Sequence, residues 1–212
     1  GLKKLIFTSS VVAYGINADN PIPLRETHPL RPNPEIYYSR AKASIESYLD
    51  DFEKEHPQLI ITRLRPCTVV GPQADPAQMV SFTGSTATLV KGYDPPYQLL
   101  HEEDLAQAIY LAIQKDIAGI FNVAGDEPRE LSQLALSKPG GKVVRLPYGL
   151  SRFLAWLAWR TKSSVFAPEW LDLACYPLVV SNDKLKLHGW NPEFTTAEAY
   201  NNLIASVGNP RP

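Results

Sequence analysis

The sequence predicts a parallel α/β sheet, because buried strands and helices alternate along the chain. Short apolar runs at residues 3–10, 59–66 and 119–125 have the length and aliphatic composition of strands that are buried on both faces. Segments with helical periodicity separate them at 36–55 and 101–115. Strand, helix, strand, helix, strand is the pattern of a parallel sheet covered by helices.

The helix boundaries have local causes. The 36–55 helix ends at His56-Pro57, because a residue before proline is disfavoured in helical conformation. The 101–115 helix opens with three acidic residues, which complement the positive end of a helix dipole. The remaining expected elements are a long surface loop (11–35), a loop (67–76), a weak helix (79–92), a helix (130–137), a strand (142–147) and an aromatic helix (150–159).

Composition narrows the classes of partner. The net charge is −1, and no run of Lys and Arg exceeds two residues, so we expect no nucleic-acid partner and no membrane partner. The two cysteines lack metal-ligand spacing, which predicts no disulfide framework and a reducing, cytoplasmic setting. His101 stands beside acidic residues, but this cluster is read as a helix start, and we expect no metal site.

The most apolar stretch is the aromatic helix, "LSRFLAWLAW". Ten residues are too few to span a bilayer. Arg152 and Arg160 fit an amphipathic helix, which we expect to pack on its own domain. A lid over an apolar substrate and a helix on a membrane surface are the alternatives.

Polar residues stand where the first two strands end. Ser9 and Ser10 follow the first strand, and Pro66 and Cys67 end the second. Parallel sheets bind ligands at the carboxyl ends of their strands. The sequence therefore predicts a crevice at this edge.

Tyr38 and Lys42 form the candidate catalytic couple. Residues four apart share one face of a helix, and a nearby ammonium stabilises a phenolate. Such a tyrosine can act as general acid/base between a hydroxyl and a carbonyl, with Ser10 orienting the same oxygen. The hydride needs a cofactor such as nicotinamide. Alone the couple is weak evidence in a chain with ten tyrosines, but it opens a helix after a strand that ends in "TSS".

Five landmarks in order resemble one family: "LIFTSSVVAYG", "LRETHPLRPNPEIYYSRAKASIE", "TRLRPCTVVGP", "HEEDLAQAI" and "GIFNVAGDEPREL". The chain resembles the extended short-chain dehydrogenase/reductases, the NAD-dependent epimerase/dehydratase group. The resemblance implies the C-terminal part of a Rossmann-type sheet with a small substrate-binding α+β region, and NAD or NADP as cofactor. It divides the chain into a partial Rossmann-type domain (1–138, with a substrate-region insertion at about 72–100) and a C-terminal substrate-binding region (139–212).

The resemblance also implies roles for individual residues. The expected catalytic residues are Ser10, Tyr38 and Lys42. The expected cofactor contacts are Ser9, Tyr38, Lys42, Pro66, Cys67 and Thr68, and the expected substrate contacts are Tyr14, Thr68 and Tyr97. A homodimer through the helix 36–55 is a further expectation.

The sequence departs from the family pattern at three points. None of the 12 glycines forms the fingerprint that cradles the cofactor phosphates, so we expect a C-terminal portion of a longer protein or a truncated gene. Val11 and Val12 follow Ser10 where dehydratases carry an acidic pair, which disfavours dehydration. Thr68 and Tyr97 stand where nucleotide-sugar enzymes have Asn and Arg, and a tyrosine lacks the bidentate phosphate contact of an arginine.

The sequence therefore predicts an NAD(P)-dependent oxidoreductase acting on a small-molecule secondary alcohol or carbonyl, similar to sugar-nucleotide epimerases. One alternative is a reductase or dehydrogenase of a less polar, steroid- or terpenoid-like alcohol. The other is a truncated, non-catalytic remnant.

Overall fold

The computed structural model describes residues 1–75, 79 and 82–207 of the 212-residue chain. The strands are β1 (Lys4–Thr8), β2 (Ile60–Pro66), β3 (Thr68–Val70), β4 (Thr86–Val90), β5 (Pro96–Tyr97), β6 (Leu99–His101), β7 (Gly119–Val123), β8 (Arg129–Glu130) and β9 (Lys142–Leu146). The α-helices are α1 (Tyr37–Glu55), α3 (Glu102–Gln114), α4 (Leu131–Ser137), α5 (Tyr148–Arg160), α6 (Asp183–Lys186) and α7 (Thr196–Val207), and two 3₁₀ helices are η1 (Val11–Tyr14) and η2 (Pro168–Ala174).

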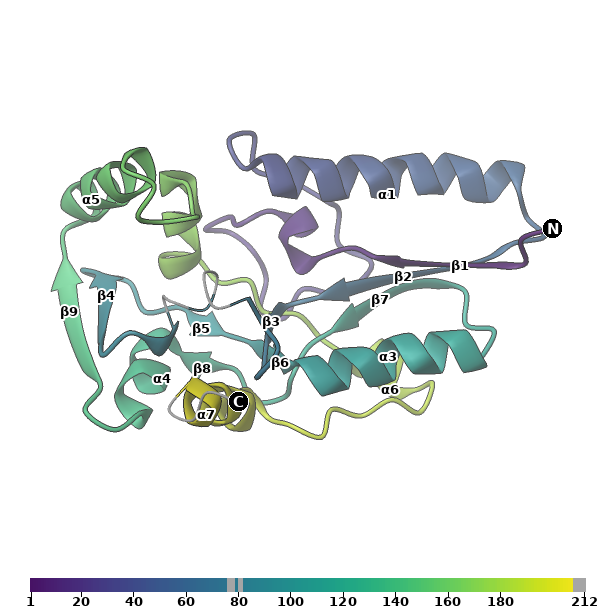
Figure 1. The fold of residues 1–212 in the computed structure, drawn as a ribbon. Coiled ribbons are helices and arrows are strands. Elements are labelled where there is room, and N and C mark those ends of the chain that lie inside the picture. The colour runs from purple at the N-terminus through teal and green to yellow at the C-terminus, as the bar shows by residue number, and fades with distance from the viewer. Residues whose placement is uncertain (76–78, 80–81, 208–212) are drawn as a thin grey trace.

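The three predicted buried strands form one parallel sheet in the order β1-β2-β7. Thr8 at the end of β1 pairs with Leu64, and Pro66 at the end of β2 pairs with Val123, so the three strands end near one edge. Helix α1 lies over one face of the sheet and α3 over the other (Figure 1). The predicted parallel α/β architecture and both long helices are confirmed.

A second group of short strands lies beyond this edge (Figure 1). It consists of the parallel pairs β3-β6 and β4-β9 and the antiparallel pair β5-β8. Strand β4 lies in the predicted insertion and β9 in the predicted C-terminal region, and their pairing joins the two into one small α+β structure with α4.

Two predictions about this group were wrong in part. Residues 79–92 were expected to form a weak helix; positions 79, 82 and 83 are helical, but Thr86–Val90 is strand β4, and positions 80 and 81 lie outside the described residues. The loop predicted at 67–76 contains strand β3; its positions from 76 on also lie outside the described residues. Both strands are rich in β-branched residues, and each gains a parallel partner from a distant segment, which local periodicity does not reveal.

The prediction of a surface loop at 11–35 was wrong for its first four residues. Val11–Tyr14 forms the 3₁₀ helix η1, and all four of its side chains are buried. Ser10 caps this helix, since its Oγ accepts a hydrogen bond from the Val12 N–H at 3.2 Å. The chain therefore turns inside the core directly after β1, which fixes Ser10 at the strand end.

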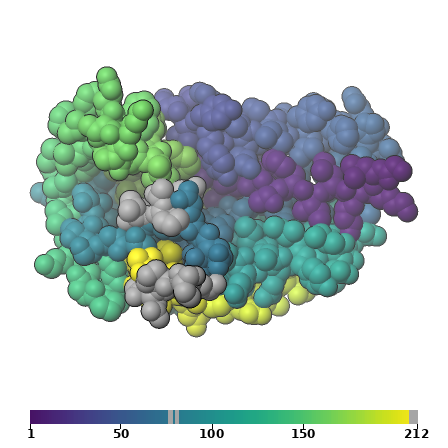
Figure 2. Space-filling model, viewed as in Figure 1, coloured from purple at the N-terminus to yellow at the C-terminus, as the bar shows by residue number. Residues whose placement is uncertain are grey.

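The aromatic helix α5 packs on its own domain as predicted, against η2 and β4, but not through its large apolar side chains. Ser151 is its only buried residue, and most of its large apolar side chains are exposed. In the space-filling view, α5 and the segment after it form the green upper left corner of the molecule (Figure 2). No helix within the described residues is long and apolar enough to cross a membrane.

Candidate active site

A cleft of about 1200 Å³ opens at the carboxyl edge of the sheet, where it meets the small α+β structure. Eight of the nine predicted site residues line it: Ser9, Ser10, Tyr38, Lys42, Pro66, Cys67, Thr68 and Tyr97. Side chains from four elements thus line one cleft: β1, η1, α1 and the end of β2.

Lys42 and Tyr38 lie side by side at the cleft wall. The Lys42 Nζ lies 5.4 Å from the centre of the Tyr38 ring and donates a hydrogen bond to the Thr8 carbonyl oxygen at 2.7 Å. Burial lowers the pKa of Lys42, and the negative charge of Glu46 one turn further along α1 counteracts this shift. The Thr8 bond uses one of three ammonium donors, so Lys42 can bind further acceptors in the cleft.

Ser10 lines the same cleft from the end of β1, where it caps η1. Its Oγ already accepts the Val12 N–H, which leaves its own O–H as the donor. Tyr38, by contrast, keeps 42% of its surface exposed, and its ring lies 6.2 Å from the ring of Trp170. A substrate oxygen between Ser10 and Tyr38 would therefore contact the Ser10 hydroxyl, whose position is fixed by its bond to Val12, and the Tyr38 hydroxyl, which is accessible from solvent.

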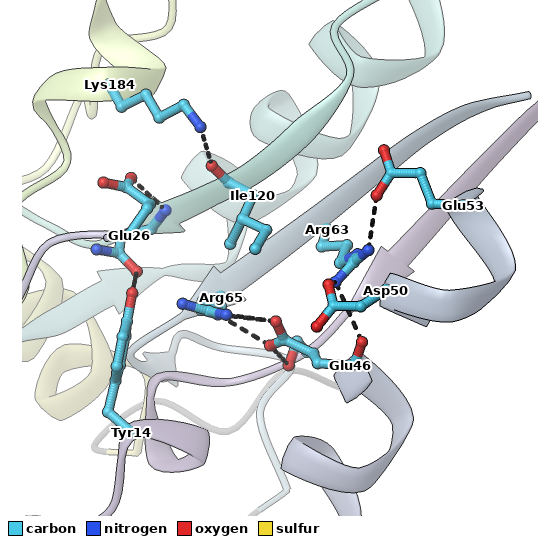
Figure 3. A network of polar contacts seen from close by, with 11 residues as sticks. Tyr14, Glu26, Glu46, Asp50, Glu53, Arg63, Arg65, Ile120 and Lys184 are labelled. Carbon is cyan, nitrogen blue, oxygen red and sulfur yellow. Dashed lines mark hydrogen bonds and ion pairs between the residues drawn. The ribbon is translucent and has the colours of Figure 1, made fainter. Parts of the chain in front are cut away.

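Beneath the cleft floor lies a buried polar network (Figure 3). The Ser9 Oγ donates to Glu46 at 2.5 Å, and Glu46 accepts two hydrogen bonds from the Nε of Arg65 and one from its Nη2. Glu46 and Arg65 are both almost fully buried. Burial acts against the guanidinium charge, but the hydrogen bond and charge of Glu46 outweigh it and raise the pKa of Arg65. The network therefore connects α1 to β2 directly under Ser9.

Tyr14 belongs to this network and not to the cleft. Its side chain is fully buried, the Arg65 guanidinium stacks 4.6 Å from its ring centre, and its hydroxyl donates to the Asn122 amide oxygen at 2.9 Å. Burial raises the pKa of Tyr14, so its hydroxyl stays protonated. The structure thus places this predicted substrate contact behind the cleft wall.

Thr68 and Tyr97 face one another at the far side of the cleft. Their hydroxyl oxygens are 2.9 Å apart and hydrogen-bonded. Burial raises the pKa of Tyr97 to about 12 and that of the neighbouring Cys67 thiol also to about 12. Cys67 is therefore a neutral thiol at ordinary pH and a poor nucleophile.

Sequence reasoning missed several cleft residues. Phe82, Lys138 and Trp170 line the cleft, although they come from segments far apart in the chain. Lys138 is buried, donates to the carbonyl oxygens of Phe82 and Gly84, and has a pKa lowered by burial. Only Trp170 had a signal in the sequence, the aromatic composition around it. Phe82 and Lys138 reach the cleft through contacts between distant segments, which local sequence does not reveal.

A parallel sheet with a cleft at the carboxyl ends of its strands is the arrangement of Rossmann-type proteins. The profile of the NAD-dependent epimerase/dehydratase family matches residues 1–124. The chain belongs to this family.

Individual relatives agree with this assignment. The chain is 24% identical over 212 residues to an uncharacterised protein of Mycobacterium tuberculosis, covering 98% of this chain and 55% of the relative. It is 31% identical over 172 residues to a UDP-glucose 4-epimerase of Yersinia pestis, covering 66% of this chain and 49% of that enzyme. The chain spans about half the length of the curated relatives it matches.

Solved structures show the same fold. The UDP-glucose 4-epimerase of Thermus thermophilus in complex with NAD superposes with a TM-score of 0.72 at 22% identity, over 99% of this chain and 65% of that one. The UDP-glucose 4-epimerase of Thermotoga maritima with UDP-glucose gives a TM-score of 0.72 at 23% identity, over 98% and 64% of the two chains. The Rossmann-type class predicted from the sequence is confirmed.

The cleft suits the nicotinamide end of a dinucleotide cofactor. Lys42 has free donors for ribose hydroxyls, and the backbone at Pro66 and Cys67 borders open space. The chain carries no G-x-G-x-x-G loop, so it does not itself offer the usual cradle for the diphosphate. Among the described residues, no group of three or more His, Cys, Asp or Glu could hold a metal ion.

Proposed function

We propose that this chain carries the proton-transfer site of an NAD(P)-dependent enzyme that interconverts a secondary alcohol and a carbonyl. The observation that supports the proposal most is the meeting of Ser10, Tyr38 and Lys42 in one cleft at the carboxyl edge of the sheet. Bound NAD or NADP would accept and return the hydride. Substrate and cofactor are carried over from what the family suggests, and the chain spans only part of its relatives.

The side chains divide the work of moving one proton. Tyr38 would take the proton from the substrate hydroxyl and return it to the carbonyl oxygen. Lys42 would stabilise the phenolate and hold the nicotinamide ribose, while Ser10 would donate a hydrogen bond to the substrate oxygen. The bond from Lys42 to the Thr8 carbonyl supports this, because it fixes the ammonium at the strand end beside Tyr38.

A nucleotide-sugar epimerase is the first candidate, because the similar proteins include UDP-glucose 4-epimerases. A reductase or dehydrogenase of a less polar alcohol is the second. Two observations favour it: Thr68 and Tyr97 satisfy each other's hydroxyls, and aromatic side chains such as Phe82 and Trp170 line the same cleft. Turnover of UDP-glucose against that of an apolar secondary alcohol separates the two.

The test of the proposal is calorimetric titration of the chain with NAD and NADH. Lys42→Ala should weaken binding by about 10- to 100-fold, since it removes charged hydrogen bonds to the cofactor. Tyr38→Phe should leave binding nearly unchanged and abolish turnover. Lys54→Ala and Tyr48→Phe are matched controls, because both residues are exposed on the same helix.

Two outcomes would count against it. Binding that Lys42→Ala and Lys54→Ala reduce equally would remove Lys42 from the site. Absence of NAD and NADH binding by the unmodified chain would favour the non-catalytic alternative.

We further propose a homodimer through α1 and a cytoplasmic setting. Tyr37, Ile45 and Tyr48 form an exposed apolar stripe on α1, and Tyr48→Ser should shift sizing chromatography toward monomer. Cys67 and Cys175 are buried free thiols, which suits a reducing compartment.

A further inference from the structure

Helix α5 packs on the molecule through its small side chains and presents its large ones to solvent. Ser151 is buried and Ala155 and Ala158 are half-buried, and these three share one side of the helix. Opposite them lie Phe153, 54% exposed, and Trp156, 45% exposed. A helix that packs on its own domain normally buries its large apolar face, so the outward face of α5 is available to an external partner.

The outward apolar side chains form a continuous surface. Leu150, Phe153, Trp156 and Leu157 are all exposed, and Phe153 lies three residues from Leu150 and Trp156 and four from Leu157. The rings of Phe153 and Trp156 stack with their centres 6.0 Å apart. Trp159, near the end of the helix, is also exposed. Aromatic side chains of this kind prefer the boundary between water and lipid headgroups.

The far end of α5 is basic, whereas its beginning lies near an acidic residue of η2, Asp172, to which the Tyr148 hydroxyl donates at 3.4 Å. Between Leu131 and Pro168 the sequence contains six Lys or Arg residues and no Asp or Glu. Arg145 is paired with Asp94, but no ion pair with Arg160 or Lys162 is recorded among the described residues. The whole-chain charge of −1, from which no membrane partner was expected, hides this local excess.

We propose that α5, with Arg160 and Lys162 at its end, binds the surface of an anionic lipid bilayer, lying along the membrane plane. The apolar face would enter the boundary between headgroups and acyl chains, while the cations would meet the lipid phosphates.

Charge argues against a second copy of the chain as the occupant. An isologous contact of two parallel α5 helices would bring Arg160 and Lys162 of both copies together and make like charges repel, and an antiparallel contact would offer these cations no acidic partner, since α5 contains no Asp or Glu. A role as substrate lid is also disfavoured, because Ala155 is the residue of α5 that lines the cleft, whereas Phe153 and Trp156 do not. An anionic surface satisfies both the apolar face and its cations.

Co-sedimentation with lipid vesicles tests the proposal. The chain should bind vesicles of phosphatidylglycerol mixed with phosphatidylcholine, with a blue shift of tryptophan fluorescence. Binding should weaken in pure phosphatidylcholine and at high salt, because salt screens the attraction.

Variants of α5 locate the contact. Arg160→Gln should weaken binding about fivefold. The double variant Phe153→Ser, Trp156→Ser should weaken it by about 100-fold or more, because two inserted rings are lost. Leu187→Ser and Lys3→Gln are matched controls, since Leu187 is 87% exposed, Lys3 is exposed, and the chain's beginning lies at the opposite end of the molecule from α5 (Figure 1). Circular dichroism confirms that each variant is folded.

Three results would overturn the proposal. The first is no binding to anionic vesicles. The second is binding that the controls reduce as much as the α5 variants. The third is a concentration-dependent dimer that the double variant dissolves while vesicles bind nothing, which would identify a second copy as the occupant.

Discussion

The floor of the cleft and helix α5 reverse the usual relation between side-chain polarity and burial. Under the cleft, Glu46 and Arg65 are charged and almost fully buried. On α5, Phe153 and Trp156 are aromatic and largely exposed. The charged groups can be buried because each has hydrogen-bonding partners, and the aromatic groups are exposed because no element within the described residues covers them. A buried polar group and an exposed apolar patch are the two departures that carry information about function.

The largest expected effect comes from breaking the buried pair. Glu46→Gln should lower the free energy of unfolding by about 3–5 kcal/mol, because it leaves the buried Arg65 guanidinium without a counter-charge. Urea denaturation of both proteins measures the difference.

Glu55→Gln is the matched control for this change, since Glu55 is the exposed last residue of the same helix. Its denaturation midpoint should stay close to that of the unmodified chain. A Glu46→Gln protein as stable as Glu55→Gln would show that the network does not hold α1 on the sheet.

The start of α3, on the other face of the sheet, allows a second, smaller test (Figure 1). The two carboxylate oxygens of Asp104 accept the N–H groups of Glu193 at 2.8 Å and Phe194 at 3.2 Å. Asp104→Ala should lower the free energy of unfolding by about 1–3 kcal/mol, because two backbone donors lose their acceptor. Glu103→Ala, on the exposed side of α3, is the control, and an equal loss in both variants would contradict the role assigned to Asp104.

Four of the cleft residues could be predicted because each lies beside a local signal. Ser9 and Ser10 end an apolar run, and Tyr38 and Lys42 open a periodic helix. Glu46 gave no comparable signal, because a glutamate in a helix with a charged surface looks like any solvated residue. Its partner Arg65 lies inside a strand, and only the folded sheet brings the two together.

For helix α5, the sequence predicted the element but not its packing. Its position and amphipathic character were predictable from the sequence, but which face it buries was not. Periodicity identifies an apolar face without revealing whether the domain covers it. The pairing of β4 with β9 was hidden for the same reason, since it depends on residues more than fifty positions apart.

The two cysteines allow the cleft and the α5 region to be compared in one measurement. Cys67 follows β2 at the cleft, and Cys175 follows η2 beside α5. Burial raises the pKa of Cys67 to about 12 and that of Cys175 to about 11. Alkylation by iodoacetamide should accelerate as pH rises from about 7 to about 9, with Cys175 about tenfold faster than Cys67, because thiolates react and a lower pKa gives more thiolate. Mass spectrometry of labelled peptides gives both rates; faster labelling of Cys67 would mean that the sheet edge opens more readily than the α5 corner.

The smallest expected effect is on α5 itself. Phe153→Ser should change the free energy of unfolding by no more than about 0.5 kcal/mol, because an exposed side chain gains little burial on folding. Phe121→Ser is the matched comparison, since that phenylalanine is fully buried in the sheet and should cost several kcal/mol. Urea denaturation of both variants without lipid decides the point. A large loss of stability with Phe153→Ser would mean that the aromatic face of α5 supports the fold. A negligible loss would mean that this exposed aromatic face contributes little to the free energy of unfolding, as expected of a surface that binds a partner outside the chain.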